Sequence, residues 1–217
     1  MNINPSGMKI KKKTDSKDST TEEKIKNAAR IIFTRKGYAA TRTRDIAEEA
    51  GFNLALLNYY FRSKEKLFNI IMLESLLGFM QSMLSVFNNK NTSLDEKIET
   101  LASNYIDLLT NQPDIPLFIL SEIRANPDAF VSKMQVKDFI MNSYFIKQLQ
   151  EELIKNKTIS VHPLHFLMNM MAMIVFPFVG MPVFKNVGEL NQDEFIALMQ
   201  QRKLLIPKWF QAIMKAG

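Results

Sequence analysis

The side chains best suited to chemistry gather in residues 44–68, RDIAEEAGFNLALLNYYFRSKEKLF. Tyr59 and Tyr60 carry hydroxyls that can bond to an anion, and the Asn58 amide can both donate and accept hydrogen bonds. Arg44 and Lys64 add a permanent cation near each end of the stretch. Since the set is rich in donors and holds no nucleophile beside a general base, it favours binding of a polyanion over catalysis.

The basic charge of the chain is concentrated around this stretch. Residues 1–68 contain 15 Lys+Arg and 8 Asp+Glu, whereas the remaining 149 residues contain 13 and 14. Part of the excess belongs to a polar leader, residues 1–18, which we expect to be a disordered basic tail. The excess outside that tail still indicates a polyanion partner for the first third of the chain.

Local signals predict the helices that position these side chains. A capping box at Thr20–Glu23 begins the first helix, and Gly37 ends it. Thr41 is expected to cap a second helix, which Gly51 ends after about two turns. Asn53 then caps a third helix and Ser63 a fourth.

The second and third helices, joined by a short glycine turn, predict a helix-turn-helix, about residues 42–61, whose second helix can enter the major groove of DNA. Leu57 and Phe61 lie one turn apart and supply its inner face. The other side chains of this helix must face outward or sideways, where they can contact phosphates and base edges. The predicted DNA-binding residues are Thr43, Arg44, Asn53, Leu54, Ala55, Asn58, Tyr59, Tyr60 and Lys64.

Two of these assignments compete with ordinary structural roles. Tyr60 is equally well explained as a core residue, whereas Tyr59 is expected to be exposed. Arg44 could instead form an ion pair with Glu48, four residues on along the same helix. Asp45 is expected to stabilise the first turn of the second helix, where the helix dipole favours an acid.

Residues 37–68, GYAATRTRDIAEEAGFNLALLNYYFRSKEKLF, closely resemble the DNA-binding domain of TetR-family transcriptional regulators. The matching positions are Gly37, Tyr38, Thr41, Arg44, Asp45, Ile46, Ala47, Ala50, Gly51, Leu57, Tyr60, Phe61, Ser63, Lys64, Glu65 and Leu67. The resemblance covers about residues 20–80. Where the family often has Lys, Thr and Tyr, this chain has Leu54, Leu56 and Asn58, which favours thymine-methyl or shape readout of the DNA.

The resemblance implies a homodimer that binds a palindromic operator, more often as a repressor than as an activator. It also implies a carboxy-terminal helical domain that binds a small molecule and dimerises through its last two helices. Ligand binding would then lower the affinity for DNA. The expected domains are the tail 1–18, a DNA-binding domain 19–68, and a ligand-binding and dimerisation domain 69–217.

The rest of the chain predicts an all-α fold without strand-like alternation. Long helices are expected at about residues 94–111, 115–125, 128–155, 163–176 and 193–216. Candidate residues for the ligand pocket are Tyr105, Phe118, Phe139 and Met170. The methionine-rich run 167–173 could line that pocket or pack in the core. Likewise, Phe195, Leu198, Met199, Trp209 and Phe210 could form a dimer seam or pack internally.

Other functions have weaker support in the sequence. His162 and His165 are too few ligands for a metal site, and no cofactor is expected. The apolar run 166–184 is broken by polar, proline and glycine residues, so we interpret it as a buried helix rather than a membrane span. With no cysteine and no signal peptide, a cytoplasmic location is expected. The alternatives are a helical ligand-binding protein or enzyme with a vestigial DNA-binding head, and a non-specific DNA-packaging protein.

Overall fold

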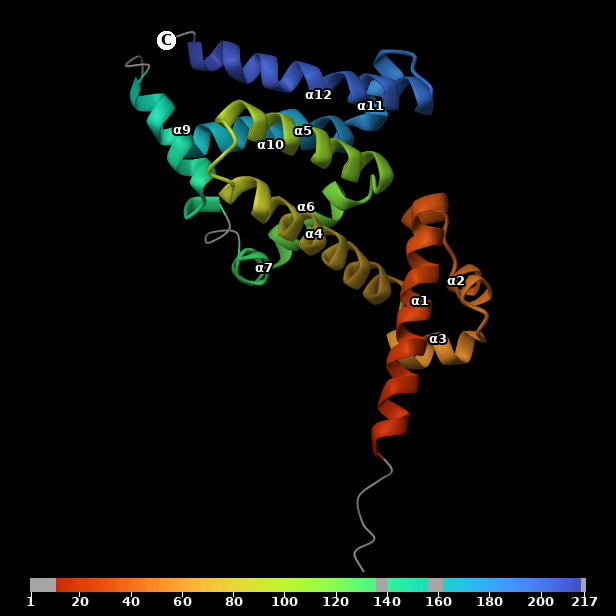
Figure 1. Cartoon of the computed structure of the whole chain (residues 1–217). Helices are drawn as coiled ribbons and strands as arrows, with labels where there is room; N and C mark the ends of the chain where they lie inside the picture. The colour runs from red at the N-terminus through yellow and green to blue at the C-terminus, as the bar shows by residue number, and fades with distance from the viewer. Residues whose placement is uncertain (1–10, 136–139, 156–161, 216–217) are drawn as a thin grey trace, which may run out of the picture. The chain divides into compact units, whose positions relative to one another are not determined.

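The computed structural model describes residues 11–135, 140–155 and 162–215, and in these residues the only regular elements are helices (Figure 1). The predicted all-α class is therefore confirmed. The helices are α1 (Lys11–Ala40), α2 (Thr43–Ala50), α3 (Leu54–Phe61), α4 (Lys64–Asn88), α5 (Leu94–Asn111), α6 (Ile115–Ala125), α7 (Pro127–Met134), α9 (Tyr144–Lys155), α10 (Pro163–Val179), α11 (Met181–Val187) and α12 (Gln192–Lys215).

The helix starts depend on caps that the sequence predicted only in part. The Asn53 side chain accepts a hydrogen bond from the Leu56 amide at 2.8 Å, and Ser63 accepts one from the Lys66 amide at 3.1 Å, so both predicted caps are confirmed. Thr41 is not the cap of α2, because its hydroxyl donates to the Gly37 carbonyl at 2.7 Å instead.

Helix α1 starts earlier than the capping box predicts. It begins at Lys11, so residues 11–18 of the predicted tail lie within it, while residues 1–10 lie outside the described part. No proline or glycine occurs between residues 11 and 36, and nothing in the sequence therefore obliges the helix to stop short of Thr20. At the other end, Gly37 has φ 72° and ψ 166°, which interrupts the helix where the sequence predicted.

The prediction of one continuous helix over residues 128–155 is wrong, because the structure has two separate helices there, α7 and α9. Helix α7 ends at Met134, the next residue, Gln135, has a left-handed φ of 47°, and α9 begins directly after Ser143. The Ser143 hydroxyl accepts a hydrogen bond from the Ile146 amide at 3.3 Å and so starts a new helix there. The break before residue 193 also contains a short helix, α11, with Pro182 in its first turn, where proline is well tolerated.

The chain divides within α4 into two compact units, residues 1–73 and 74–217. The boundary between functional domains at residue 68 stays a prediction. In the first unit α2 packs against both α1 and α3. Its buried core consists of Ile25, Ala28, Ala29, Ile32, Phe33, Ile46, Ala47, Leu57, Phe61, Leu67, Phe68, Ile71 and Met72. Burying this apolar area is the main force that holds α1, α2, α3 and the start of α4 together.

In the second unit α5 packs against α9, α10 and α12 (Figure 1). A capping box starts α5, because the Glu96 amide donates to Ser93 Oγ at 3.2 Å while the Ser93 amide donates to Glu96 Oε2 at 2.7 Å. Lys97 is fully buried, and its ammonium donates to the carbonyls of Asn89 and Thr92 at 2.6 and 2.7 Å. These bonds fix the turn between α4 and α5.

Helix α4 is also long and apolar enough to cross a membrane, as are α10 and α11 if these two count as one broken span. The bend of 69° between α10 and α11 divides the run that the sequence singled out. The apolar residues of α4 have partners in the fold: Leu67 and Ile71 lie in the core of the first unit, and Met83 and Phe87 in that of the second. The interpretation of 166–184 as one buried helix is wrong: Phe166, Met170, Ile174 and Phe178 are buried, whereas Met168, Phe176 and Val183 are exposed. A core helix of a soluble protein passes the same test of length and composition as a membrane span.

Candidate nucleic-acid interface

The turn between α2 and α3 is built around a left-handed glycine. Gly51 has φ 71° and ψ 28°, and its amide donates to the Glu48 carbonyl at 3.1 Å. The Phe52 amide donates to the Ala47 carbonyl at 2.9 Å, which closes the end of α2 as in a Schellman motif. The geometry confirms the predicted helix-turn-helix and the reason for a glycine at its centre.

Replacing Gly51 with Ala should therefore cost about 1–2 kcal/mol, the penalty for a left-handed residue with a Cβ atom. A Cβ atom at this position meets nothing within 4 Å, so the cost would come from the backbone alone. Gly78→Ala, in the open middle of α4, is the matched control and should stabilise the protein slightly. Denaturant unfolding measures both variants, and an unchanged midpoint for Gly51→Ala would contradict this account of the turn.

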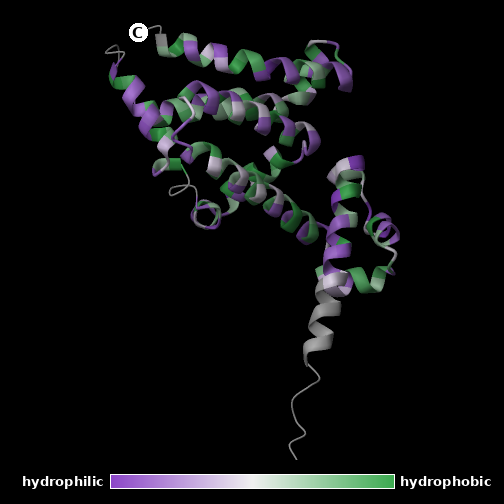
Figure 2. Ribbon diagram, in the orientation of Figure 1, coloured by the Kyte–Doolittle hydropathy of each residue, from purple (hydrophilic) through white to green (hydrophobic). Residues whose placement is uncertain are grey.

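Helix α3 anchors itself through one narrow side. Leu57 and Phe61 are 0 and 2% exposed, as the sequence predicted for the inner face. The helix is nevertheless apolar over most of its length (Figure 2). It therefore carries more apolar side chains than the two that are fully buried. Ala55 and Asn58 are exposed, and Tyr59 is 77% exposed, whereas Tyr60 is half-buried with its ring 5.3 Å from that of Tyr59. The remaining α3 positions, Leu54 and Leu56, are also half-buried.

Of the side chains at the start of α2, some make contacts within the fold and others are exposed and able to contact DNA. Asp45 Oδ2 accepts from the Arg42 amide and from Lys36 Nζ, each at 3.0 Å, which gives it the predicted structural role. The Arg42 amide and then Lys36 lower the pKa of Asp45, so their stabilising effect is present at neutral pH and is lost as acid protonates the group. Thr43 is half-buried, while Arg44 is exposed and makes no ion pair with Glu48 or with any other described residue.

Lys64 was predicted to bind DNA, but in the structure its ammonium binds backbone carbonyls of its own unit. Its ammonium donates to the carbonyls of Tyr38 and Thr41, both at 2.9 Å, and stands 4.2 Å from the centre of the Tyr38 ring. The side chain therefore ties the start of α4 to the last turn of α1 and to the residue that follows it. Any contact with a phosphate would have to use the remaining N–H donor.

Two cations near the end of α3 were missed by the sequence reasoning. Arg62 and Lys66 are exposed, and neither forms an ion pair within the described part of the chain. Arg62 has φ 57° and ψ −35°, a strained conformation in which the Ser63 amide donates to the Phe61 carbonyl. Their position within six residues after Tyr60 was a signal available in the sequence. Arg44 lies in the first turn of α2, Arg62 directly follows α3 and Lys66 lies in the first turn of α4, so these three exposed cations are on or next to the elements that flank α3.

Three of the four residues predicted to line a ligand pocket, Tyr105, Phe118 and Met170, are buried in the second unit. Tyr105 stacks on Phe79 with 4.8 Å between ring centres. Burial raises the pKa of Tyr105 to about 12, which keeps its hydroxyl neutral. Phe139 lies outside the described residues. The structure contains a cavity between α10, α11 and α12, and Tyr105, Phe118 and Met170 are not among the described residues that line it.

The two histidines serve as ordinary surface residues. His162 Nδ1 accepts a hydrogen bond from the Leu164 amide at 3.2 Å and so caps α10, and His165 is exposed in the first turn of that helix. No group of three or more metal-binding side chains occurs in the residues that the structure describes.

Comparison with known proteins agrees with the geometry of the first unit. The sequence model of the family described as bacterial regulatory proteins, tetR family, matches residues 25–71, the part that contains α2, α3 and the start of α4. A curated relative, "Probable HTH-type transcriptional regulator YttP" of Bacillus subtilis (strain 168), is 24% identical over 202 residues. That alignment covers 91% of this chain and 96% of the relative.

Solved structures extend the likeness to the whole fold. A TetR/AcrR-family regulator from Thermobifida fusca matches with a TM-score of 0.57 and 19% identity, over 87% of this chain and 97% of that one. FadR from Bacillus subtilis, crystallised with stearoyl-CoA, matches with a TM-score of 0.54 and 17% identity, over 85% and 96% of the two chains. The helix-turn-helix and the family match identify residues 25–71 as a DNA-binding domain of the tetR type, and with the curated relative they support a TetR-family, DNA-binding transcriptional regulator.

Proposed function

We propose that the protein is a homodimeric repressor that binds a palindromic operator and is released from it by a small molecule. The observation that carries this proposal is the exposed face of α3, formed by Ala55, Asn58 and Tyr59, on a helix that Leu57 and Phe61 fix in the core. A helix packed along one narrow side can enter a groove about 12 Å wide without disturbing its own unit. The exposed cations would add affinity that does not depend on sequence.

We assign the side chains on and beside α3 to two groups, those proposed to contact phosphates and those proposed to contact bases. Tyr59, Thr43 and the exposed Arg62 and Lys66 are proposed to contact phosphates, which fix the position of the helix on the duplex. Arg44 and the exposed Ala55 and Asn58 are proposed to face base edges, Arg44 toward guanine and Asn58 toward adenine.

Four other members of the predicted set are given narrower roles. Asn53 caps α3, and the half-buried Leu54 is proposed to reach a thymine methyl from the edge of the helix. The half-buried Tyr60 is proposed to support Tyr59 through their ring contact. Lys64 is proposed to act chiefly by fixing the fold of the first unit, since two carbonyls already hold its ammonium.

The second copy is proposed to pack on α10 and α12. Leu164, Met168 and Met171 expose 45, 56 and 36% of their surface and recur at the spacing of one helical face. On α12, Leu198 and Trp209 are likewise exposed, whereas Phe195, Met199 and Phe210 are buried within the chain. Only part of the predicted seam thus remains available for a partner. Water-exposed apolar stripes on two neighbouring helices favour a second protein surface.

The effector is proposed to bind the second unit, and the protein is proposed to act in the cytoplasm, where its DNA lies. FadR from Bacillus subtilis, which shares the fold, has been crystallised with stearoyl-CoA, which supports a small-molecule effector as a class. The alternative of an enzyme with a vestigial DNA-binding head has less support, because the chain's family match lies in the DNA-binding unit itself.

Selection of bound duplexes from a random DNA pool tests the proposed function. The full-length protein should enrich one palindromic sequence, whose half-sites are about one helical turn apart, and should retain it at physiological salt. Enrichment of a non-palindromic site would contradict the homodimer. Binding without any preferred sequence would indicate non-specific DNA packaging instead.

A further inference from the structure

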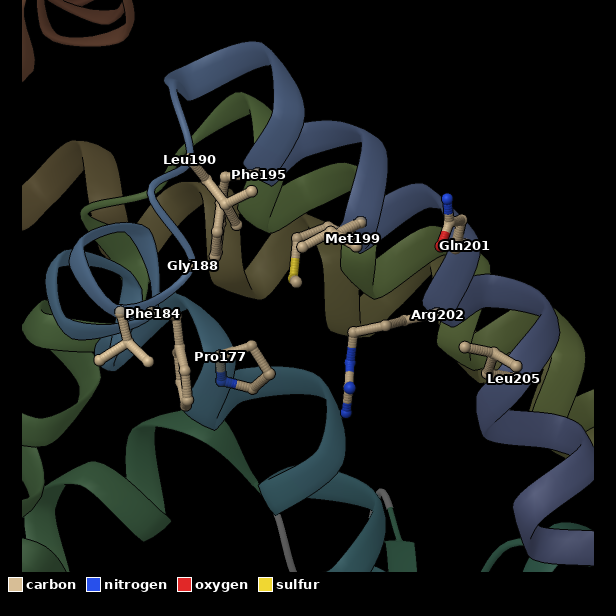
Figure 3. A pocket seen from close by; sticks show the side chains of 11 residues that line it. Pro177, Phe184, Gly188, Leu190, Phe195, Met199, Gln201, Arg202 and Leu205 are labelled. Carbon is tan, nitrogen blue, oxygen red and sulfur yellow. The ribbon is translucent and has the colours of Figure 1, made fainter.

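A cavity of about 400 Å³ lies between α10, α11 and α12, entirely within the second unit (Figure 3). Its wall is mainly apolar and includes Pro177 on α10, Phe184 on α11, and Leu198, Met199 and Leu205 on α12. The volume falls within the range of about 300–1,000 Å³ that small-molecule sites occupy. The lining therefore suits the hydrocarbon part of a small ligand.

Arg202 is the one charged residue among the described residues that line this cavity. Its side chain extends from α12 toward α10, where one guanidinium nitrogen donates to the Met173 carbonyl at 2.7 Å (Figure 3). The Nε atom is buried and has no hydrogen-bond partner among the described residues. Of the five N–H donors of the guanidinium, the structure thus accounts for one, which leaves the group able to bind an acceptor.

The positive charge of Arg202 also lacks a counter-ion. The next residue, Lys203, forms an ion pair with Asp107, whereas Arg202 forms none within the described part of the chain. The Trp209 ring centre lies 5.1 Å from the guanidinium carbon and gives only partial compensation. Burial lowers the pKa of Arg202 from its ordinary value, although arginine stays protonated at neutral pH. A half-buried cation without an anion is a costly arrangement that a ligand can relieve.

We propose that this cavity binds an amphipathic monoanion, with its carboxylate or phosphate on Arg202 and its hydrocarbon tail against α10, α11 and α12. A planar guanidinium is well matched to such a head group, because it can offer two parallel N–H donors. The proposal rests on the proposed function in that the ligand would act as the effector. Occupation of a site between α10 and α12 would alter the two helices on which the second copy is proposed to pack, and so would couple ligand to DNA.

Titration calorimetry of the full-length protein with decanoate and with decan-1-ol tests the site. The two probes share a ten-carbon tail and differ only in the head group. The unmodified protein should bind decanoate about 10- to 100-fold more tightly, the difference expected for a hydrogen bond to a charged group. Arg202→Leu should lose that preference and keep its affinity for decan-1-ol. Lys208→Leu, which removes an exposed cation from the same helix outside the cavity lining, should leave the preference intact.

Several outcomes would overturn the proposal. These are failure of both probes to bind, equal affinity for the two, or an unchanged preference in Arg202→Leu. Decanoate binding only after Met168→Glu has separated the protomers would show that a second copy fills the cavity. If Arg202→Leu does not fold, the unmodified protein is titrated with decyltrimethylammonium instead. This probe has the same ten-carbon tail and a cationic head group, so a site that contains Arg202 should not bind it. If the DNA pool yields a palindrome but decanoate does not bind, the ligand site proposed at Arg202 is wrong and the proposed function is unaffected.

Discussion

Replacing Lys64 with Ala is expected to lower the free energy of unfolding of the first unit by about 2–4 kcal/mol. The ammonium makes charged hydrogen bonds to the carbonyls of Tyr38 and Thr41, and such bonds contribute about 1.5–3 kcal/mol each in favourable settings. Its position over the Tyr38 ring adds about 0.5–1 kcal/mol. Because the side chain is half-buried, the net loss should fall below the sum of these values.

Hydrogen exchange of the amides in α2 and α3 measures this loss directly, since it reports the stability of the first unit within the full chain. Lys66→Ala is the control, because Lys66 is exposed and makes no ion pair with a described residue. The control should leave exchange unchanged but reduce the slope of DNA affinity against salt by about one counter-ion. Unchanged exchange in Lys64→Ala, together with a reduced salt slope, would show that Lys64 is a phosphate contact and not a structural one.

Replacing Met168 with Glu is expected to separate the protomers and to weaken operator binding by about 10²- to 10⁴-fold. The substitution places a charge at the middle of the exposed stripe on α10, where a second copy would have to bury it. A monomer presents one α3 to the DNA instead of two. Linking two binding modules raises affinity by about 10²- to 10⁴-fold, so a monomer should lose about that factor. Each protomer should still fold, since Met168 is 56% exposed in the single chain.

Light scattering with size-exclusion chromatography gives the oligomeric state, and fluorescence anisotropy gives the affinity for the selected operator. Leu117→Glu provides a matched control, because Leu117 is 58% exposed but lies on α6 and not on either of the two helices proposed to form the seam. It should remain dimeric and bind the operator normally. A dimeric Met168→Glu variant with full affinity would place the seam elsewhere.

The sequence predicted most accurately what depends on neighbouring residues. The bounds of α5 and α6 match the prediction, and Asn53 and Gly51 form the cap and the turn that their types implied. The division of residues 128–155 was not foreseeable, because no proline or glycine occurs there and the break depends on Gln135 taking a left-handed conformation. Non-glycine residues rarely do so, and only the surrounding structure can impose it.

The candidate sites illustrate the same limit. The exposed positions of Ala55, Asn58 and Tyr59 follow from helical periodicity once Leu57 is known to face inward. The partners of Lys64 do not, because they lie more than 20 residues earlier in the chain and only the fold brings them close. The cavity at Arg202 was missed for the same reason, since its wall combines three helices and its charge could not be seen to lack an anion.

The affinity of Ala55→Glu for the selected operator tests most directly whether α3 enters the groove. Ala55 is exposed on α3, so the new carboxylate should leave the fold intact while facing the negative charge of the duplex. Gln81→Glu, an exposed residue of α4 in the second unit, carries the same change in net charge. The account predicts a loss of about 10- to 100-fold for Ala55→Glu and little change for Gln81→Glu. Equal affinities for the two variants would contradict it.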